Sequence, residues 1–181
     1  ESEPATDRGT PVVVADLLKT IYQEAQVLSG EQHQITLEVD ETAIIYGHTE
    51  ELHSACSNLV YNAVRYTPPG GDIAIRWYQD PEGIHLAIRD TGEGIAPEHL
   101  PRLTERFYRV DVGRSRSQGG TGLGLAIVKH VLNRHKGHLH IESEVGKGSL
   151  FRCDFPHTMN QAVEEVGSLV DGDDKVDEEE S

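Results

Sequence analysis

The chain has 181 residues and a formal net charge of −15 at pH 7, and this length suits a single domain with tails rather than two complete domains. No run of about 18 apolar residues occurs, and the acidic N-terminus lacks a basic export signal, so we expect neither a membrane span nor a signal peptide. An acidic body offers no basic surface to nucleic acid, so we expect no nucleic-acid partner.

The first half of the chain predicts two helices and two short strands. Residues 1–11 are rich in Pro, Thr and charge, which is typical of a linker. The apolar periodicity that follows predicts helix, strand, strand and helix over residues 12–28, 35–40, 44–46 and 49–66. We expect Thr49 to cap the second helix, and the Thr67-Pro68-Pro69-Gly70-Gly71 segment to end it.

The second half predicts a sheet built mostly from hairpins. A turn signal at Asp80-Pro81-Glu82-Gly83 separates two alternating runs, which predicts a β-hairpin. The expected elements are strands 73–78 and 84–90, a short helix 97–104, a helix 123–135, and strands 138–143 and 149–155. The apolar face of the longer helix is expected to contain Leu125, Ile127, Val128, Val131 and Leu132.

Two features of composition concern the tail and the thiols. Residues 157–181 contain nine acidic residues and one lysine, and such a segment buries too little apolar surface to fold, so we expect an acidic, disordered tail.

Cys56 and Cys153 lie far apart in the sequence without a CxxC pattern. We expect buried free thiols, with a single disulfide as the alternative.

Four polar side chains share one face of the predicted helix 49–66: Asn58, Asn62, Arg65 and Tyr66. Two carboxamide oxygens one turn apart can ligate Mg²⁺, and a guanidinium one turn further can pair with phosphate. The tyrosine ring could then cover a base. A solvated polar face is the alternative reading of the same spacing.

Asp90 ends a predicted strand and is followed by Gly92 and Gly94, so a ligand can approach its carboxylate closely. A carboxylate in this position can accept a hydrogen bond from an amine. An ordinary Asp-Thr-Gly turn is the alternative.

A glycine cluster runs directly into the predicted helix 123–135. Gly120, Gly122 and Gly124 allow the backbone to approach a ligand, and the first amides of the helix suit an anion. The cluster therefore predicts a phosphate cradle, with a tight connection as the alternative. The preceding Arg106-Phe107-Tyr108-Arg109 segment suits a lid over phosphates.

Taken together, the segments 58–67, 90–95, 105–111 and 120–125 resemble the ATP-binding catalytic domain of sensor histidine kinases. The resemblance covers about residues 12–156, and its second half is similar to phosphate-regulon sensor kinases. It implies an α+β fold, a two-layer sandwich of a mixed, mostly antiparallel sheet packed on helices, as in gyrase-, Hsp90- and MutL-type ATPases. It also implies that the domain binds ATP with Mg²⁺.

The resemblance assigns a role to each group of residues. It implies that Asn62 ligates Mg²⁺ with assistance from Asn58. Arg65 would contact phosphate, Tyr66 would flank adenine, and Asp90 would accept from the adenine amine. The catalytic residues are expected to be Asn62, Arg65 and Arg109, and the remaining nucleotide-binding positions are expected to be Gly92, Gly94, Ile95, Phe107, Gly120, Thr121, Gly122, Leu123, Gly124, Leu125 and Ser149.

Two of these positions have further implied features. Phe107 would join Arg109 in the hinge of the lid. Ser149 occupies a position where the family usually has threonine, and its hydroxyl could still bond near Asp90.

The resemblance also implies partners that this chain lacks. The acceptor histidine of the family lies in a His-Glu-x-x-Thr-Pro segment of a helical dimerisation domain, and none of the ten histidines here has that context. We expect a monomeric, cytoplasmic portion of an inner-membrane sensor that donates the γ-phosphoryl group to a separate dimerisation domain, for relay to the receiver domain of a response regulator. The alternative is a nucleotide-binding or ATP-hydrolysing module of the same superfamily without histidine transfer.

Overall fold

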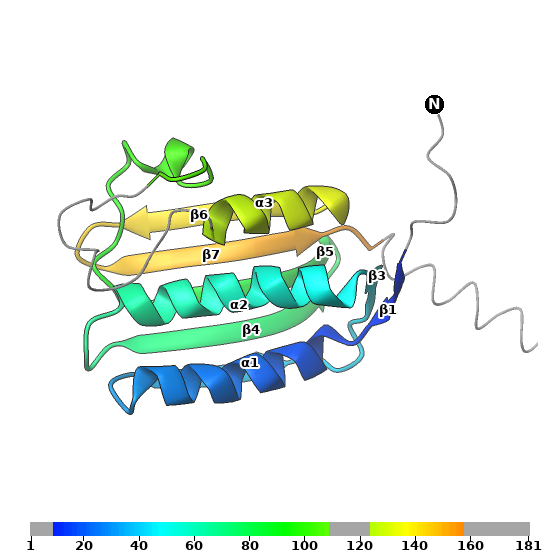
Figure 1. Ribbon diagram of the computed structural model, residues 1–181, viewed down its shortest axis with the longest axis horizontal. Helices are drawn as coiled ribbons and strands as arrows, with labels where there is room; N and C mark the ends of the chain where they lie inside the picture. Colours follow the sequence, from blue (N-terminus) through cyan, green and yellow to red (C-terminus); the bar gives the residue numbers. More distant parts are fainter. Residues whose placement is uncertain (1–8, 109–123, 158–181) are drawn as a thin grey trace, which may run out of the picture.

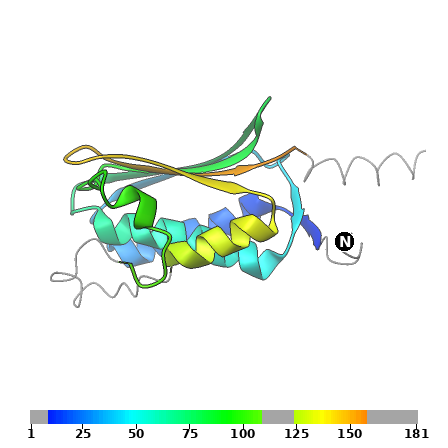
Figure 2. The same ribbon diagram turned by 90° about the horizontal axis from the view of Figure 1, so that it is seen from above.

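The computed structural model describes residues 9–108 and 124–157, and three α-helices within them lie on one face of a five-stranded sheet (Figure 1; Figure 2). In chain order the elements are β1 (Thr10–Val12), α1 (Val14–Ser29), β2 (Gln34–Val39), β3 (Ile45–Gly47), α2 (Thr49–Tyr66), β4 (Asp72–Asp80), β5 (Gly83–Asp90), the 3₁₀ helix η1 (Leu100–Arg102), α3 (Gly124–Arg134), β6 (His138–Glu144) and β7 (Gly148–Phe155). Thr10 and Pro11, which we expected in the linker, belong to β1.

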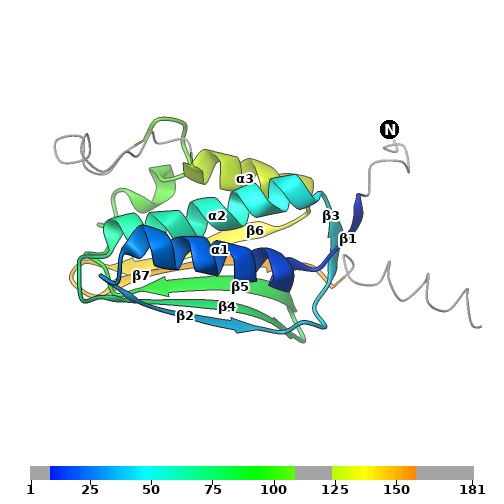
Figure 3. The ribbon, with the colours of Figure 1, turned by 60° about the horizontal axis from the view of Figure 1, so that its bottom comes forward.

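The main sheet has the strand order β2-β4-β5-β7-β6 (Figure 3). Its only parallel pair is β2 with β4, in which Ile35 lies opposite Ile73; the other three pairs are antiparallel. The predicted hairpin β4–β5 is therefore confirmed, as is the mixed, mostly antiparallel sheet. The strands β2 and β3, which are neighbours in sequence, do not pair with each other, because β3 pairs with β1 instead.

The helices pack on the sheet through the apolar faces that the sequence predicts. On α2 the buried side chains include Leu52, Cys56, Leu59, Val60, Ala63 and Val64. This burial leaves the opposite face of α2, with its asparagines, directed away from the strands, since residues three and four apart share one side of a helix.

Two details of the helices differ from expectation. Thr49 is the first residue of α2, and the N-cap is His48, which makes no side-chain capping hydrogen bond. Ile127 is 40% exposed, although its neighbours Val128 and Val131 are buried. The helix α3 packs against α2 and the edge strand β6, so only part of its circumference is covered.

The core centres on Trp77, which is 2% exposed and donates its indole N–H to the carbonyl oxygen of Ala43 at 2.9 Å. Both cysteines are buried and free, as predicted. Burial raises the pKa of the Cys56 thiol to about 12, so this thiol stays neutral and packs as a small apolar group. None of the helices within residues 9–108 and 124–157 combines the length and the hydropathy of a membrane-spanning segment.

Candidate functional site

The C-terminal half of α2 meets the start of α3 at a close approach of backbone to side chain. A Cβ on Gly124 would lie 2.9 Å from Asn58 Oδ1 and 3.8 Å from Asn62 Nδ2, so a larger residue would collide with the first amide. Asn58 Nδ2 donates to the carbonyl oxygen of Ser54 at 2.8 Å, which leaves Oδ1 as the atom that faces Gly124. The asparagine face of α2 and the first residue of α3 thus lie close together.

Asp90 is 8% exposed and lies at the end of β5, where the chain turns away from the sheet. Burial raises the pKa of its carboxyl group, and hydrogen bonds from the backbone N–H groups of Gly92 and Ser149 offset part of that rise. The Gly92 bond measures 2.9 Å. A buried carboxylate held by two backbone donors is a fixed hydrogen-bond acceptor.

Gly92 lies where the turn after Asp90 passes close to the C-terminal end of α2. A Cβ at this glycine would lie 2.8 Å from the carbonyl oxygen of Tyr66, 2.9 Å from Asp90 Oδ1 and 3.5 Å from Thr67 Oγ1. The end of α2 and the end of β5 are therefore in direct contact. Thr67, which the sequence predicted only as a helix stop, is 3% exposed and belongs to this contact.

The loop after Asp90 is docked on the β6–β7 turn. Gly94 has φ +76°, and a Cβ there would lie 2.1 Å from the carbonyl oxygen of Glu144. The backbone N–H of Ile95 donates to Ser143 Oγ at 2.7 Å. Glycine is needed at 94 for two independent reasons, since the left-handed backbone and the close carbonyl both exclude a side chain.

Ser149, whose hydroxyl could bond near Asp90 according to the resemblance, lies opposite Asp90 in the β5–β7 pair, and its hydroxyl bonds another serine. Ser149 Oγ lies 2.7 Å from Ser143 Oγ and is hydrogen-bonded to it, while the backbone N–H of Ser149 serves Asp90. The alternation of side chains along β6 and β7 places Ser143 opposite Ser149, on the same face, which accounts for the pairing. The sequence does not predict the hydrogen bond of Ser143 with Ser149, because this bond depends on the pairing register of β6 and β7.

We expect Gly94→Ala to lower the free energy of unfolding by roughly 2–4 kcal/mol, because left-handed strain adds to a steric clash. The matched control is Gly70→Ala: Gly70 has φ +90° but nothing within 4 Å of its Cβ position, so only the strain of about 1–2 kcal/mol applies. Urea unfolding of both variants measures the difference. Equal losses would show that the contact with Glu144 contributes nothing.

Other predicted site residues lie at the surface of the same end of the fold. Arg65 is exposed, Tyr66 is 51% exposed and Phe107 is 70% exposed with φ +65°. Leu125 is partly buried and packs against the core. The predicted residues that lie outside the described part of the chain are Arg109, Gly120, Thr121, Gly122 and Leu123.

The described groups suit a ligand with an amine at one end and anions with a hard cation at the other. Asp90 supplies a buried acceptor, and the Thr67 hydroxyl beside it is buried without a hydrogen-bond partner among the described residues. Asn58 and Asn62 supply carboxamide oxygens, which Mg²⁺ accepts as ligands. The absent Cβ at Gly124 lets the start of α3 lie close to these amides.

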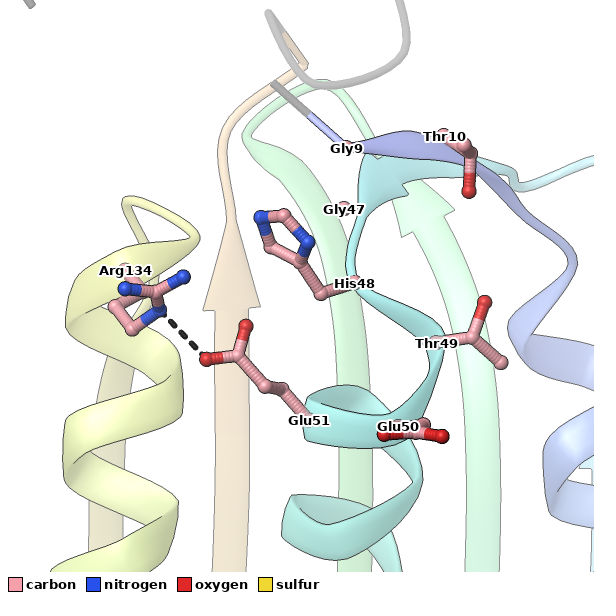
Figure 4. A pocket seen from close by; sticks show the side chains of 8 residues that line it. All are labelled: Gly9, Thr10, Gly47, His48, Thr49, Glu50, Glu51 and Arg134. Carbon is pink, nitrogen blue, oxygen red and sulfur yellow. Dashed lines mark ion pairs between the residues drawn. The ribbon is translucent and has the colours of Figure 1, made fainter. Parts of the chain in front are cut away.

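A separate pocket of about 420 Å³ lies at the other end of α2, where β3 leads into this helix and α3 ends (Figure 4). Its wall includes an ion pair between Arg134 Nε and Glu51 Oε1 at 2.6 Å. The 18 residues of α2 place it roughly 25 Å from the end of the helix at Tyr66. This pocket therefore does not belong to the site around Asp90.

The sequence matches one protein family and is similar to several known proteins. A profile of the family described as "Histidine kinase-, DNA gyrase B-, and HSP90-like ATPase" matches residues 47–159. The chain is 57% identical to the phosphate regulon sensor protein PhoR of Pseudomonas aeruginosa over 80% of this chain and 33% of that protein. PhoR of Haemophilus influenzae is 43% identical over 77% of this chain and 33% of that protein. The chain thus spans about a third of the length of these curated relatives.

Solved structures show the same fold. The mycobacterial sensor histidine kinase MprB is similar with a TM-score of 0.73 and 30% identity, over 81% of this chain and 97% of that chain. Full-length ShkA in complex with AMPPNP is similar with a TM-score of 0.70 and 25% identity, over 86% of this chain and 32% of that chain. The architecture described above is therefore shared with both proteins.

Proposed function

The chain belongs to the histidine kinase-, DNA gyrase B- and HSP90-like ATPase family, and from this premise we propose that it donates the γ-phosphoryl group of ATP to a histidine on a separate helical dimerisation domain. It is an ATP-binding catalytic domain of the kind found in sensor histidine kinases.

The observation that carries the proposal is the contact of Asn58 with Gly124. This contact joins two segments that are far apart in sequence, the polar face of α2 and the first residue of α3. We assign Asn62 and Asn58 as the residues that hold Mg²⁺, and Arg65 as a phosphate contact. Bound Mg²⁺ supplies charge neutralisation for the phosphates.

At the other end of the site we assign Asp90 as the acceptor for the adenine amine. Gly92 keeps the turn close enough for the base to reach the carboxylate, and Tyr66 flanks the base. These residues act by positioning: they hold the nucleotide in one orientation, so that the γ-phosphoryl group points out of the site toward the acceptor. We assign Arg109 and Phe107 to the hinge of a lid.

The glycine segment supplies the remaining nucleotide contacts in this proposal. We assign Gly120, Thr121, Gly122, Leu123 and Gly124 to the phosphates. The loop residues Gly94 and Ile95, with Leu125 and Ser149, shape the pocket around the nucleotide.

The partners we propose are the dimerisation domain of the same sensor and the receiver domain of a response regulator. The similarity to two PhoR proteins supports a phosphate-responsive sensor as the parent protein, with this domain on the cytoplasmic side of the membrane. The residues before β1 would connect the domain to the dimerisation helices, and residues 157–181 would be an acidic tail.

The test is transfer of label from γ-labelled ATP to a separately prepared dimerisation domain of the P. aeruginosa relative. We expect acid-labile label on the acceptor only when this chain and Mg²⁺ are both present. Steady ATP turnover without an acceptor, and no label on it, would favour the hydrolytic alternative. That alternative is less well supported, because the relatives reported above are sensor kinases.

A further inference from the structure

The exposed side of α3 is basic, although the chain as a whole carries a net charge of −15. Residues 124–141 contain no aspartate or glutamate, so no carboxylate of this segment can neutralise a neighbouring cation. The opposite side of the helix is buried against the rest of the fold. We call the exposed side the basic face of α3, and define it by the exposed residues Lys129, His130, Arg134 and Lys136.

Two lysines of the basic face have no carboxylate partner. Arg134 is paired, since its Nε lies 2.6 Å from Glu51 Oε1. Within residues 9–108 and 124–157, neither Lys129 nor Lys136 forms an ion pair, whereas Lys147 on the β6–β7 turn pairs with Glu144 at 3.2 Å. The basic face is therefore a local positive surface on an acidic protein, and it is complementary to an acidic segment.

The acidic tail, residues 157–181, begins beside the end of α3. A Cβ on Gly137, three residues after the end of α3, would lie 3.1 Å from the carbonyl oxygen of Asp154 and 3.2 Å from Phe155 Cδ1. The ends of α3 and β7 are therefore neighbours, as Figure 1 shows. His157 Nε2 lies 2.5 Å from the carbonyl oxygen of Asp80, which fixes the start of the tail at this end of the sheet.

The tail has the charge and the length to cover the basic face. It contains nine acidic residues, and seven of them lie within residues 171–180. The 24 residues after His157 can extend to roughly 80 Å, whereas the 11 residues of α3 span roughly 16 Å. A flexible tether of this kind holds its acidic residues at an effective concentration on the order of millimolar, so a weak contact is sufficient for docking.

We propose that the acidic tail docks on the basic face of α3 of the same chain, with the carboxylates of residues 171–180 beside Lys129 and Lys136. The contact is intramolecular because the tail starts next to the end of the helix that it covers. Exposed ion pairs are individually weak and are screened by salt, so docking is reversible and is lost at high ionic strength. While docked, the tail keeps other acidic surfaces away from α3.

The test places a paramagnetic label at the end of the tail, on Ser181→Cys, in the full ¹⁵N-labelled chain. Cys56 and Cys153 are buried, so a nitroxide maleimide reacts with the new thiol. At about 0.01 M salt we expect the amide signals of residues 127–134 to lose most of their intensity. At about 1 M salt they should regain it, because the Debye length is then only about 3 Å.

The decisive variant combines Lys129→Gln with Lys136→Gln and should restore the signals at low salt. Its matched control combines Lys19→Gln with Lys147→Gln, which removes the same charge from lysines outside α3, and should keep the loss. Full intensity of the α3 signals in the parent chain at low salt would overturn the inference. A loss that persists at high salt, or without Lys129 and Lys136, would reflect only the tethering of the label and would overturn it too.

Two further outcomes would assign the basic face to another occupant. Signal loss in a ¹⁵N-labelled chain without the nitroxide, mixed with nitroxide-labelled chain without ¹⁵N, would mean that the tail of a second copy docks there. If the tail label causes no loss, but the α3 signals shift when the dimerisation domain of the P. aeruginosa relative is added, the face binds that domain. Either outcome contradicts docking of the tail on its own chain.

Discussion

Asn62→Ala is expected to reduce phosphoryl transfer to the acceptor domain by roughly 10²- to 10³-fold. Charge stabilisation by a bound metal ion is worth several kcal/mol, and each 1.36 kcal/mol is a tenfold change in rate. Asn62 is half-buried on the polar face of α2, so the shorter side chain should leave the fold intact. Label transfer measured under single-turnover conditions gives the rate directly.

The control for this experiment is Asn133→Ala, which makes the same change at an exposed position of α3. It should transfer label at the parent rate. Thermal unfolding of both variants separates a loss of catalysis from a loss of folded protein. Parent-rate transfer by folded Asn62→Ala would remove Asn62 from the metal site, whatever the remaining residues do.

The asparagine face illustrates how much of the site the sequence predicts. Helical periodicity alone places Asn58 and Asn62 on one side of α2, because the buried residues of that helix occupy the other side. The resemblance then supplies their role. Neither the helical periodicity nor the resemblance predicts the contact of Asn58 with Gly124, since this contact depends on how two helices pack against each other.

The parallel pair β2–β4 is a second feature that periodicity does not predict. Alternation of apolar residues indicates that a segment is a strand, but it does not choose the partner. The segments 35–40 and 44–46 are close in sequence, yet β3 pairs with β1, and β2 extends the sheet beside β4. Pairing depends on long-range packing, and here α1 and α2 both cover the sheet.

The hydroxyl groups of Thr67 and Ser149 show a limit of sequence patterns. Sequence patterns identify polar residues but not which of two nearby hydroxyls finds a protein partner. The register of β6 and β7 brings Ser143 opposite Ser149 and pairs the two hydroxyls, whereas the hydroxyl of Thr67 is buried without one. Which hydroxyl finds a partner therefore depends on the three-dimensional fold.

Asp90→Asn should weaken ADP binding by roughly 10- to 100-fold, because a hydrogen bond to a charged group contributes about 1.5–3 kcal/mol. The same change should stabilise the nucleotide-free protein at neutral pH. Burial raises the pKa of this carboxyl group, so its ionised form is less favourable in the folded chain than in the unfolded chain. Asparagine keeps one acceptor oxygen for the backbone donors and removes the buried charge.

The pH dependence of this stabilisation has a definite sign. In the parent chain, the folded state binds more protons at Asp90 than the unfolded state between the ordinary carboxyl pKa of 3.8 and the raised folded pKa. The stability that protonated Asp90 contributes is therefore complete below 3.8 and is lost as pH rises through the folded pKa. The advantage of Asp90→Asn in urea unfolding should accordingly grow from pH 4 to pH 7.

Asp72→Asn provides the matched control, since Asp72 is exposed at the start of β4 and its replacement changes the net charge equally. This control should show neither the loss of ADP affinity nor the pH-dependent gain in stability. A stabilised Asp90→Asn variant that still bound ADP with the parent affinity would mean that the buried carboxylate serves no ligand. The energetic cost of burying Asp90 would then have no compensating role in nucleotide binding, and the base would have to lie elsewhere on the fold.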